Sequence, residues 1–133
     1  MQYTIGNPIK NSPSRVLVVD DDWLNQDLLE GILSTVGYPT LQAQNAEKAI
    51  MLAQNEHPDL IILDVRLPKV NGFEICIQLK SNPKTAHIPI IMITGHKTDE
   101  DEIKAQDARA DLFIERTVNT DKLLDYIHNI LNQ

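Results

Sequence analysis

Short apolar runs rich in β-branched residues alternate along the chain with longer segments in which apolar residues recur at helical spacing. The runs predict five strands, at 16–19, 40–43, 60–63, 90–93 and 112–114. A helical segment follows each strand, and strands that alternate with helices are typical of a parallel sheet. The pattern therefore predicts an α/β domain whose parallel sheet is covered by helices on both faces.

The helical segments carry apolar stripes and end signals. The first predicted helix ends at Gly37 as a C-cap, and its stripe consists of Leu24, Leu28, Leu29, Ile32, Leu33 and Val36. Asn45 is the expected N-cap of the second helix, and Cys76 on the third is expected to be a small core residue. The fifth helix is expected from Asn119, with an apolar face formed by Leu123, Leu124, Ile127, Ile130 and Leu131.

The fourth predicted helix, at about 99–108, has a different composition. Ile103 is its only large apolar residue among several acids. A helix anchored by so little apolar burial can shift at low cost, which suits a switch. The alternative interpretation is an ordinary solvated helix.

Composition narrows the class of protein. The 133 residues are 42% apolar, which suits one globular domain with a single core. A single cysteine excludes a disulfide framework. The 19 acidic and 12 basic residues give a net charge of −7, which opposes direct binding to nucleic acid.

The sequence also indicates the cellular location of the protein and the bounds of the domain. The apolar runs are too short to cross a bilayer, so we expect no membrane segment. Residues 1–14 lack an apolar block, which argues against a secretory signal and for a flexible leader before a domain at 15–133. We expect a cytoplasmic protein. No output domain is visible, so the chain is either a stand-alone unit or a piece of a larger protein.

Acidic residues follow two of the predicted strands. Asp20, Asp21 and Asp22 follow the first strand, and Asp64 follows the third. Ligands of open parallel sheets bind at the carboxyl ends of the strands, so these acids are expected to meet. Two carboxylates about 4.5 Å apart repel by about 3 to 4 kcal/mol at an effective dielectric constant of 20, which calls for a cation. Helix N-capping is the alternative role for Asp21 or Asp22.

The chemistry of these residues favours Mg²⁺ and a phosphoryl group. Mg²⁺ prefers oxygen ligands, and the histidines stand too far apart in sequence to suggest zinc. Thr94 after the fourth strand and Arg116 after the fifth add a hydrogen-bond donor and a positive charge. Asp64 could then act as a nucleophile that forms an aspartyl phosphate. A nucleotide site is disfavoured because no glycine-rich loop follows the first strand.

Four segments together resemble the receiver domain of two-component response regulators, over about residues 15–131. They are VLVVDDD at 16–22, PDLIILDVRLPKVNGFE at 58–74, IPIIMITGH at 88–96 and ADLFIER at 110–116. The resemblance implies a flavodoxin-like fold with strand order 2-1-3-4-5. It also implies a signalling switch rather than an enzyme, with a sensor histidine kinase or phosphotransfer protein as phosphodonor.

The resemblance also assigns roles to residues. It implies that Asp64 is the phosphoacceptor and that Asp20 and Asp21 hold Mg²⁺ together with Asp64 and the backbone carbonyl of Arg66. Thr94 matches the switch hydroxyl, and Phe113 matches the aromatic residue coupled to it. Pro68 and Gly72 shape the loop after the acceptor, and Arg66 and His96 flank the phosphoryl site. The surface of the fourth helix, fifth strand and fifth helix is expected to meet an effector protein.

One departure from the family concerns the end of the fifth strand. Relatives have lysine followed by proline with a cis peptide, whereas this chain has Arg116 and Thr117. Arginine keeps the charge, but its planar fork suits bidentate contacts. A cis bond before a residue other than proline costs about 2.5 to 4 kcal/mol, so we predict a trans peptide.

Two alternative functions remain open. Loss of the Lys-Pro pair is compatible with a degenerate receiver that docks partners without phosphorylation. The Asp-x-Asp pattern of Asp20 and Asp22 would suit a small phosphohydrolase, but the short chain argues against that class. Trp23 follows the acids, and we expect it to pack at the entrance of the first helix. A partly exposed anchor for a partner is the alternative role.

Overall fold

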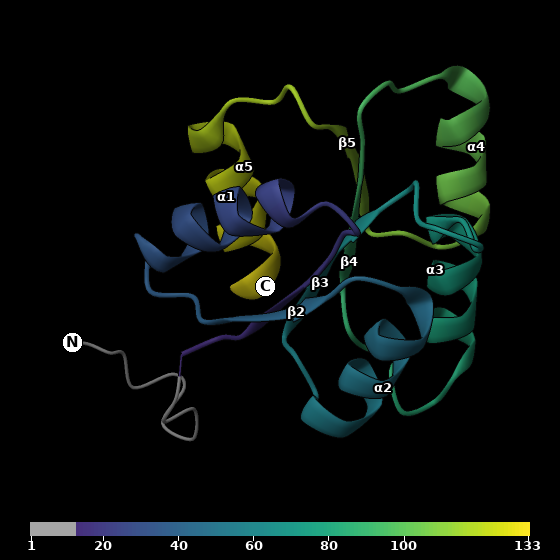
Figure 1. Cartoon of the computed structure of the whole chain (residues 1–133), viewed down its shortest axis with the longest axis horizontal. Coiled ribbons are helices and arrows are strands. Elements are labelled where there is room, and N and C mark those ends of the chain that lie inside the picture. Colours follow the sequence, from purple (N-terminus) through teal and green to yellow (C-terminus); the bar gives the residue numbers. More distant parts are fainter. Residues whose placement is uncertain (1–12) are drawn as a thin grey trace.

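Strand and helix alternate five times in the computed structural model, which describes residues 13–133 (Figure 1). The strands are β1 (Val16–Val19), β2 (Thr40–Ala43), β3 (Leu60–Asp64), β4 (Ile90–Thr94) and β5 (Leu112–Glu115). The helices are α1 (Trp23–Ser34), α2 (Ala46–Glu56), α3 (Gly72–Ser81), α4 (Asp99–Asp107) and α5 (Thr120–Leu131). Of the predicted leader at 1–14, residues 1–12 lie outside the described residues.

All five strands form one parallel sheet in the order β2-β1-β3-β4-β5, as predicted. Val19 at the end of β1 is level with Ala43 on β2 and with Leu63 on β3. The strand order reverses at β1, since β2 lies on one side of it and β3 on the other. The residues that follow β1 and β3 therefore leave the sheet next to each other, where ligands bind in folds of this kind.

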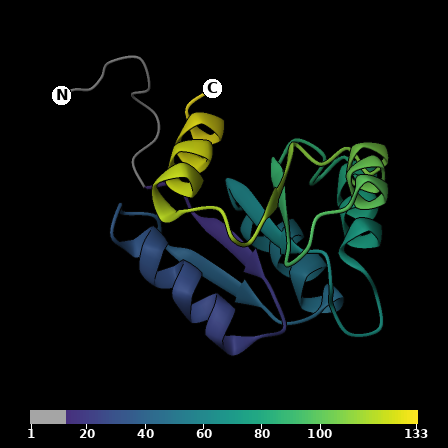
Figure 2. The same ribbon diagram turned by 90° about the horizontal axis from the view of Figure 1, so that it is seen from above.

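Helices cover both faces of the sheet, with α1 and α5 on one face and α2, α3 and α4 on the other (Figures 1 and 2). Alternate residues of β1 contribute to the two cores. Leu17 and Val19 belong to the core beneath α2, α3 and α4, and Val16 and Val18 belong to the core beneath α1 and α5. Burial on both faces explains why the strand sequences are continuously apolar.

Polar side chains cap the helices at their N-termini. Asn45 accepts a hydrogen bond from the backbone N–H of Lys48, and Asn119 accepts one from Lys122. Both predicted helix starts are confirmed. A cap of this kind contributes about 1 kcal/mol because it satisfies a backbone donor that has no partner within the helix.

The end and the buried face of α1 differ from the prediction. The helix ends at Ser34, and Gly37 lies beyond it in a turn with φ 85°. Leu29 and Leu33 are buried as expected and Ile32 is half-buried, but Leu24, Leu28 and Val36 are exposed. The buried face of α1 is therefore narrower than the apolar stripe, and Leu29 and Leu33 contribute it to the core that α1 shares with α5.

The fourth helix is also anchored differently from the prediction. Ile103 is 59% exposed, whereas Ala105 and Ala108 are buried. The small alanine side chains allow the end of α4 to approach the core closely, and Ile103 projects away from it. The predicted thin anchoring of α4 is therefore confirmed, but its buried residues are alanines.

In the part of the chain that the structure describes, no helix is long and apolar enough to span a membrane.

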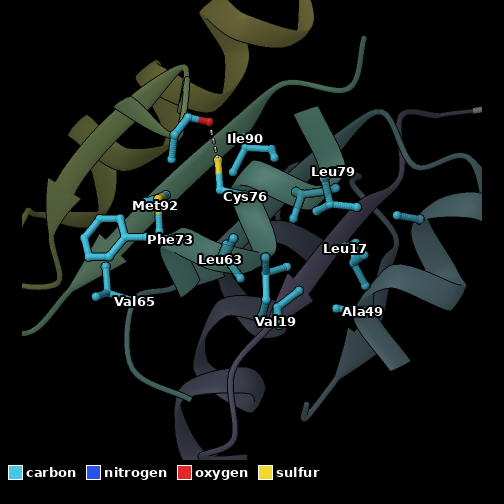
Figure 3. Packing of buried hydrophobic residues seen from close by; sticks show 14 of the residues in the cluster. Leu17, Val19, Ala49, Leu63, Val65, Phe73, Cys76, Leu79, Ile90 and Met92 are labelled. Atoms are coloured by element: carbon cyan, nitrogen blue, oxygen red, sulfur yellow. Dashed lines mark hydrogen bonds between the residues drawn. The ribbon is translucent and has the colours of Figure 1, made fainter. Parts of the chain in front are cut away.

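Cys76 lies within the core beneath α3, as predicted (Figure 3). Its thiol donates a hydrogen bond to the backbone carbonyl of Ala108 at 3.3 Å, which joins α3 to the end of α4. Burial raises the pKa of the Cys76 thiol to about 11 from an ordinary value of 9.0. The side chain therefore remains a neutral core group at physiological pH.

We predict that Cys76 resists thiol reagents in the folded protein. The thiolate is the reactive form, and a pKa raised by about two units lowers its population by about 100-fold at pH 8. Labelling with Ellman's reagent should be at least that much slower in buffer than in denaturant, because burial also blocks access. Equal rates in the two solvents would contradict the packing of Cys76.

Candidate functional site

Three carboxylates meet at the carboxyl ends of β1 and β3. Asp20 and Asp21 directly follow β1, and Asp64 is the last residue of β3. One oxygen from each lies within 4.8 Å of the others. The structure thus brings together the acids that the sequence placed at two strand ends. Their close packing concentrates negative charge that a cation must offset.

Asp20 is buried and held by the backbone around it. Its Oδ1 accepts a hydrogen bond from the backbone N–H of Asp22 at 2.9 Å. Asp22 itself caps α1, because its Oδ1 accepts from the backbone N–H of Leu24. Of the two acids considered as caps, Asp22 takes that role, and Asp21 joins the cluster.

Gln26 supports the loop that carries Asp20, and the sequence pattern did not single it out. The residue is fully buried, and its Nε2 donates to the backbone carbonyls of Asp20 and Ala43 at 2.8 and 2.7 Å. Its Oε1 accepts from Gln44. Gln26 therefore ties the ends of β1 and β2 to α1. A buried glutamine among exposed polar residues of a helix gives no sequence signal.

Asp64 is nearly buried, with 12% of its side chain exposed. Burial is the main cause that raises the pKa of Asp64 from 3.8 to about 6, and the nearby Asp20 carboxylate adds to the increase. The backbone N–H of Arg66, which donates to Oδ1 at 3.1 Å, and the charge of Arg116 act in the opposite direction. Desolvation outweighs them because few water molecules reach the carboxylate.

Arg116 reaches the cluster from the end of β5. Its Nη2 lies 3.2 Å from Asp20 Oδ2 and 3.5 Å from Asp64 Oδ2. Its backbone N–H donates to the carbonyl of Thr94 at 2.8 Å, which fixes the start of the side chain beside β4. No peptide bond among the described residues is cis, so the predicted trans bond between Arg116 and Thr117 is confirmed.

The loop after Asp64 approaches its backbone closely. A Cβ atom at Gly72 would lie 2.3 Å from the carbonyl oxygen of Asp64. The Gly72 N–H donates to the carbonyl of Val65 at 2.7 Å. Only glycine fits this contact without a backbone shift, so Gly72 sets the distance between α3 and β3.

Thr94 lies at the end of β4 and is fully buried. Its hydroxyl donates to the carbonyl of His96 at 3.3 Å and accepts from the His96 N–H at 3.4 Å. The hydroxyl is therefore engaged within its own loop. The side chains of Arg66 and His96, which the resemblance places beside the phosphoryl site, are exposed.

Phe113 packs between α3 and the loop that precedes α4. Its ring meets Phe73 edge to face at a centroid distance of 6.3 Å. Lys97 lies over the ring at 5.4 Å, donates to the Phe113 carbonyl at 3.2 Å and pairs with Glu102 at 3.4 Å. Lys97 thus joins the loop after β4 to both β5 and α4. Sequence reasoning missed it because an isolated lysine has no distinguishing pattern.

Trp23 begins α1 and is 64% exposed. The expectation that it packs at the entrance of the helix is wrong. The helix is capped by Asp22, and the indole lies on its solvent side, close in sequence to the acid cluster.

The sequence model of the response regulator receiver domain family matches residues 16–128. The chain therefore belongs to this family, as the resemblance implied. It is 30% identical over 119 residues to the polar-differentiation response regulator DivK of Brucella anthropi, which covers 90% of this chain and 97% of DivK. It is 35% identical over 119 residues to the DNA-binding dual master transcriptional regulator RpaA of Synechocystis sp., with 90% of this chain and 49% of RpaA covered.

Solved structures show the same fold. A CheY-like response regulator receiver domain protein of Methanospirillum hungatei superposes with a TM-score of 0.84 at 30% identity, over 91% of this chain and 95% of that one. The chemotaxis protein CheY4 of Vibrio cholerae gives a TM-score of 0.84 at 25% identity, over 90% and 99% of the two chains. The five-stranded flavodoxin-like architecture is thus confirmed.

We predict that Asp64→Asn stabilises the folded protein in the absence of metal. The native pKa of about 6 lies above the unfolded value, so ionised Asp64 opposes folding. The gain should be absent below about pH 4, grow as pH rises to about 6 and remain at about 3 kcal/mol above that pH. Urea unfolding from pH 3.5 to 8 measures it, and a gain that shrinks as pH rises would contradict the buried carboxylate.

Proposed function

We propose that Asp64 accepts a phosphoryl group from a phosphohistidine on a sensor histidine kinase or a phosphotransfer protein. The observation that carries this proposal is the meeting of Asp20, Asp21 and Asp64 beside the Arg116 guanidinium. A site with several acids and one fixed cation suits a group whose transfer is controlled by positioning and by charge. Membership of the receiver family supports the assignment.

Three carboxylates with oxygens within 4.8 Å of one another suit a hard divalent cation, and Mg²⁺ is the ion of this size that favours such ligands. Asp20, Asp21 and Asp64 would hold it, together with the backbone carbonyl of Arg66. When bound, the ion neutralises charge on the transferred phosphoryl group.

In the proposed transfer, an Asp64 carboxylate oxygen attacks phosphorus. The new P–O bond forms as the P–N bond to the histidine breaks, and the imidazole nitrogen keeps the electron pair and takes up a proton from solvent. The Arg66 N–H fixes the orientation of the carboxylate through Oδ1. Without metal the pKa of Asp64 is about 6, so the carboxylate is mostly ionised at neutral pH and available for attack.

After transfer, the Thr94 hydroxyl and Phe113 are proposed to rearrange. Thr94 would exchange its contacts with His96 for a phosphoryl oxygen and draw the loop after β4 towards the site. Lys97 lies on this loop and contacts Phe113 and Glu102, so the movement would reach β5 and α4. A helix whose buried contacts are alanines can respond at low energetic cost.

The surface of α4, β5 and α5 is the proposed docking site for an effector protein. A groove of about 560 Å³ lies there between Lys97, Glu102, Phe113 and Tyr126. Lys97, Glu102 and Phe113 belong to the switch contacts described above, so phosphorylation of Asp64 would change the walls of the groove. We propose that the protein is a cytoplasmic signalling switch with no direct contact to nucleic acid, whose phosphorylation and dephosphorylation are steps of that switch.

We predict that acetyl phosphate and Mg²⁺ add about 80 Da to the protein, as a single phosphoryl group does. Intact-mass spectrometry measures the adduct, which should be stable in acid and lost in base as an acyl phosphate. The Asp64→Asn variant should show none. Asp107→Asn removes an exposed acid of α4 and should be modified like the original protein. A folded protein without an adduct, or an adduct retained in Asp64→Asn, would contradict the proposal.

A phosphorylation-independent docking module is the second candidate, because Arg116 and Thr117 replace the Lys-Pro pair of the family. Hydrogen exchange of the same samples separates the two functions. A switch should change the protection of the loop after β4 and of α4 upon phosphorylation, whereas a docking module should form the adduct slowly or not at all and leave protection unchanged.

A further inference from the structure

The Arg116 guanidinium lies between the two inner carboxylates of the acid cluster. Its Nη2 is 3.2 Å from Asp20 Oδ2 and 3.5 Å from Asp64 Oδ2. The other oxygen of each carboxylate accepts a backbone N–H, from Asp22 to Asp20 and from Arg66 to Asp64. Both oxygens of both carboxylates are therefore engaged by groups of the protein itself.

The arginine contact is only partly open to solvent. The side-chain exposures are 30% for Arg116, 3% for Asp20 and 12% for Asp64. Charges interact more strongly here than at an exposed surface, because water screens them less. Within the described part of the chain Arg116 pairs with Asp20 and Asp64, whereas Asp21 is exposed and forms no ion pair with it.

We propose that Arg116 is a resident counter-cation of the acid cluster that weakens Mg²⁺ binding until a phosphoryl group is present. A divalent ion that takes oxygens from Asp20 and Asp64 competes with the guanidinium for the same lone pairs. The two cations also repel each other at a separation of a few ångströms. This inference deepens the proposed function and rests on Asp64 being the phosphoacceptor.

A phosphoryl group on Asp64 changes this competition. It brings further negative charge and several acceptor oxygens, to which a planar guanidinium binds in a bidentate manner. Arg116 then has a better partner than the carboxylates, so Asp20 Oδ2 is released. Binding of the metal and the presence of the phosphoryl group therefore favour each other, and by linkage each raises the affinity for the other.

The test titrates the full chain with Mg²⁺ alone, without phosphodonor, by isothermal calorimetry and by the emission of Trp23. Arg116→Met removes the charge and retains the length of the apolar stem, and Arg116→Lys keeps the charge but removes the fork. We expect Arg116→Met to bind Mg²⁺ about tenfold more tightly than the original protein. Arg116→Lys should lie between the two, because a compact ammonium group bridges two carboxylates less completely.

Arg15→Gln is the matched control, because it makes the same change in net charge at the opposite end of β1. Arg15 pairs with Glu56 at 3.3 Å and contacts no member of the cluster. Its removal should leave the Kd for Mg²⁺ unchanged. Equal tightening in Arg15→Gln and Arg116→Met would indicate a general charge effect and would overturn the inference.

Thermal unfolding gives a second readout that does not depend on phosphorylation. Without Mg²⁺, Arg116→Met should melt below the original protein because its acids have lost their counter-cation, and with saturating Mg²⁺ this difference should disappear or reverse. A deficit that persists in Mg²⁺, or a Kd that is unchanged or weaker, overturns the inference. If Arg116→Met does not fold, tighter binding by Arg116→Lys supports the inference and an unchanged Kd contradicts it.

The same experiments distinguish a failure of the inference about Arg116 from a failure of the proposed function. Equal Mg²⁺ affinity in all variants, together with an acetyl phosphate adduct on Asp64, rejects the role of Arg116 and leaves the receiver function in place. Absence of Mg²⁺ binding in every variant rejects both the inference and the metal requirement of the proposed function.

Discussion

Repulsion between carboxylates at the ends of β1 and β3 is the constraint on which the rest of the site depends. Asp20, Asp21 and Asp64 lie close enough to share one cation, and two of them are shielded from water. Such an arrangement is unfavourable unless positive charge or hydrogen-bond donors offset it. Arg116 and the backbone N–H groups of Asp22 and Arg66 supply both. These contacts keep the three carboxylates close together in spite of their mutual repulsion.

The sheet makes this arrangement rigid. Parallel strands buried on both faces place the ends of β1 and β3 level with each other, and Gln26 joins the loop after β1 to β2 and α1. Gly72 lets α3 approach the backbone of Asp64. Helix α4 is less firmly anchored than the acid cluster, since its buried contacts are those of Ala105 and Ala108 and its Glu102 pairs with Lys97. A fixed acid cluster next to a weakly anchored helix suits the switch proposed above.

Hydrophobic periodicity predicted the strands and the existence of each helix, because a strand buried on both faces leaves a continuous apolar run. It was less reliable for the helix faces. Leu24 and Leu28 are exposed although they fit the predicted stripe of the first helix. Ile103, the only large apolar residue of α4, is also exposed, and the buried residues there are Ala105 and Ala108. Periodicity shows that one side of a helix is apolar, but the width of the buried face depends on which strands lie beneath it.

The sequence by itself determined the fold class and the acids of the site, since the carboxyl ends of neighbouring parallel strands lie at one edge of the sheet and acids follow two of them. The tertiary structure alone decided how those acids are paired. The guanidinium of Arg116 between Asp20 and Asp64, the hydroxyl of Thr94 turned to His96, and Lys97 over Phe113 are contacts of side chains with several rotamers. Such contacts depend on distances between separate strands, and neither spacing nor residue type encodes those distances.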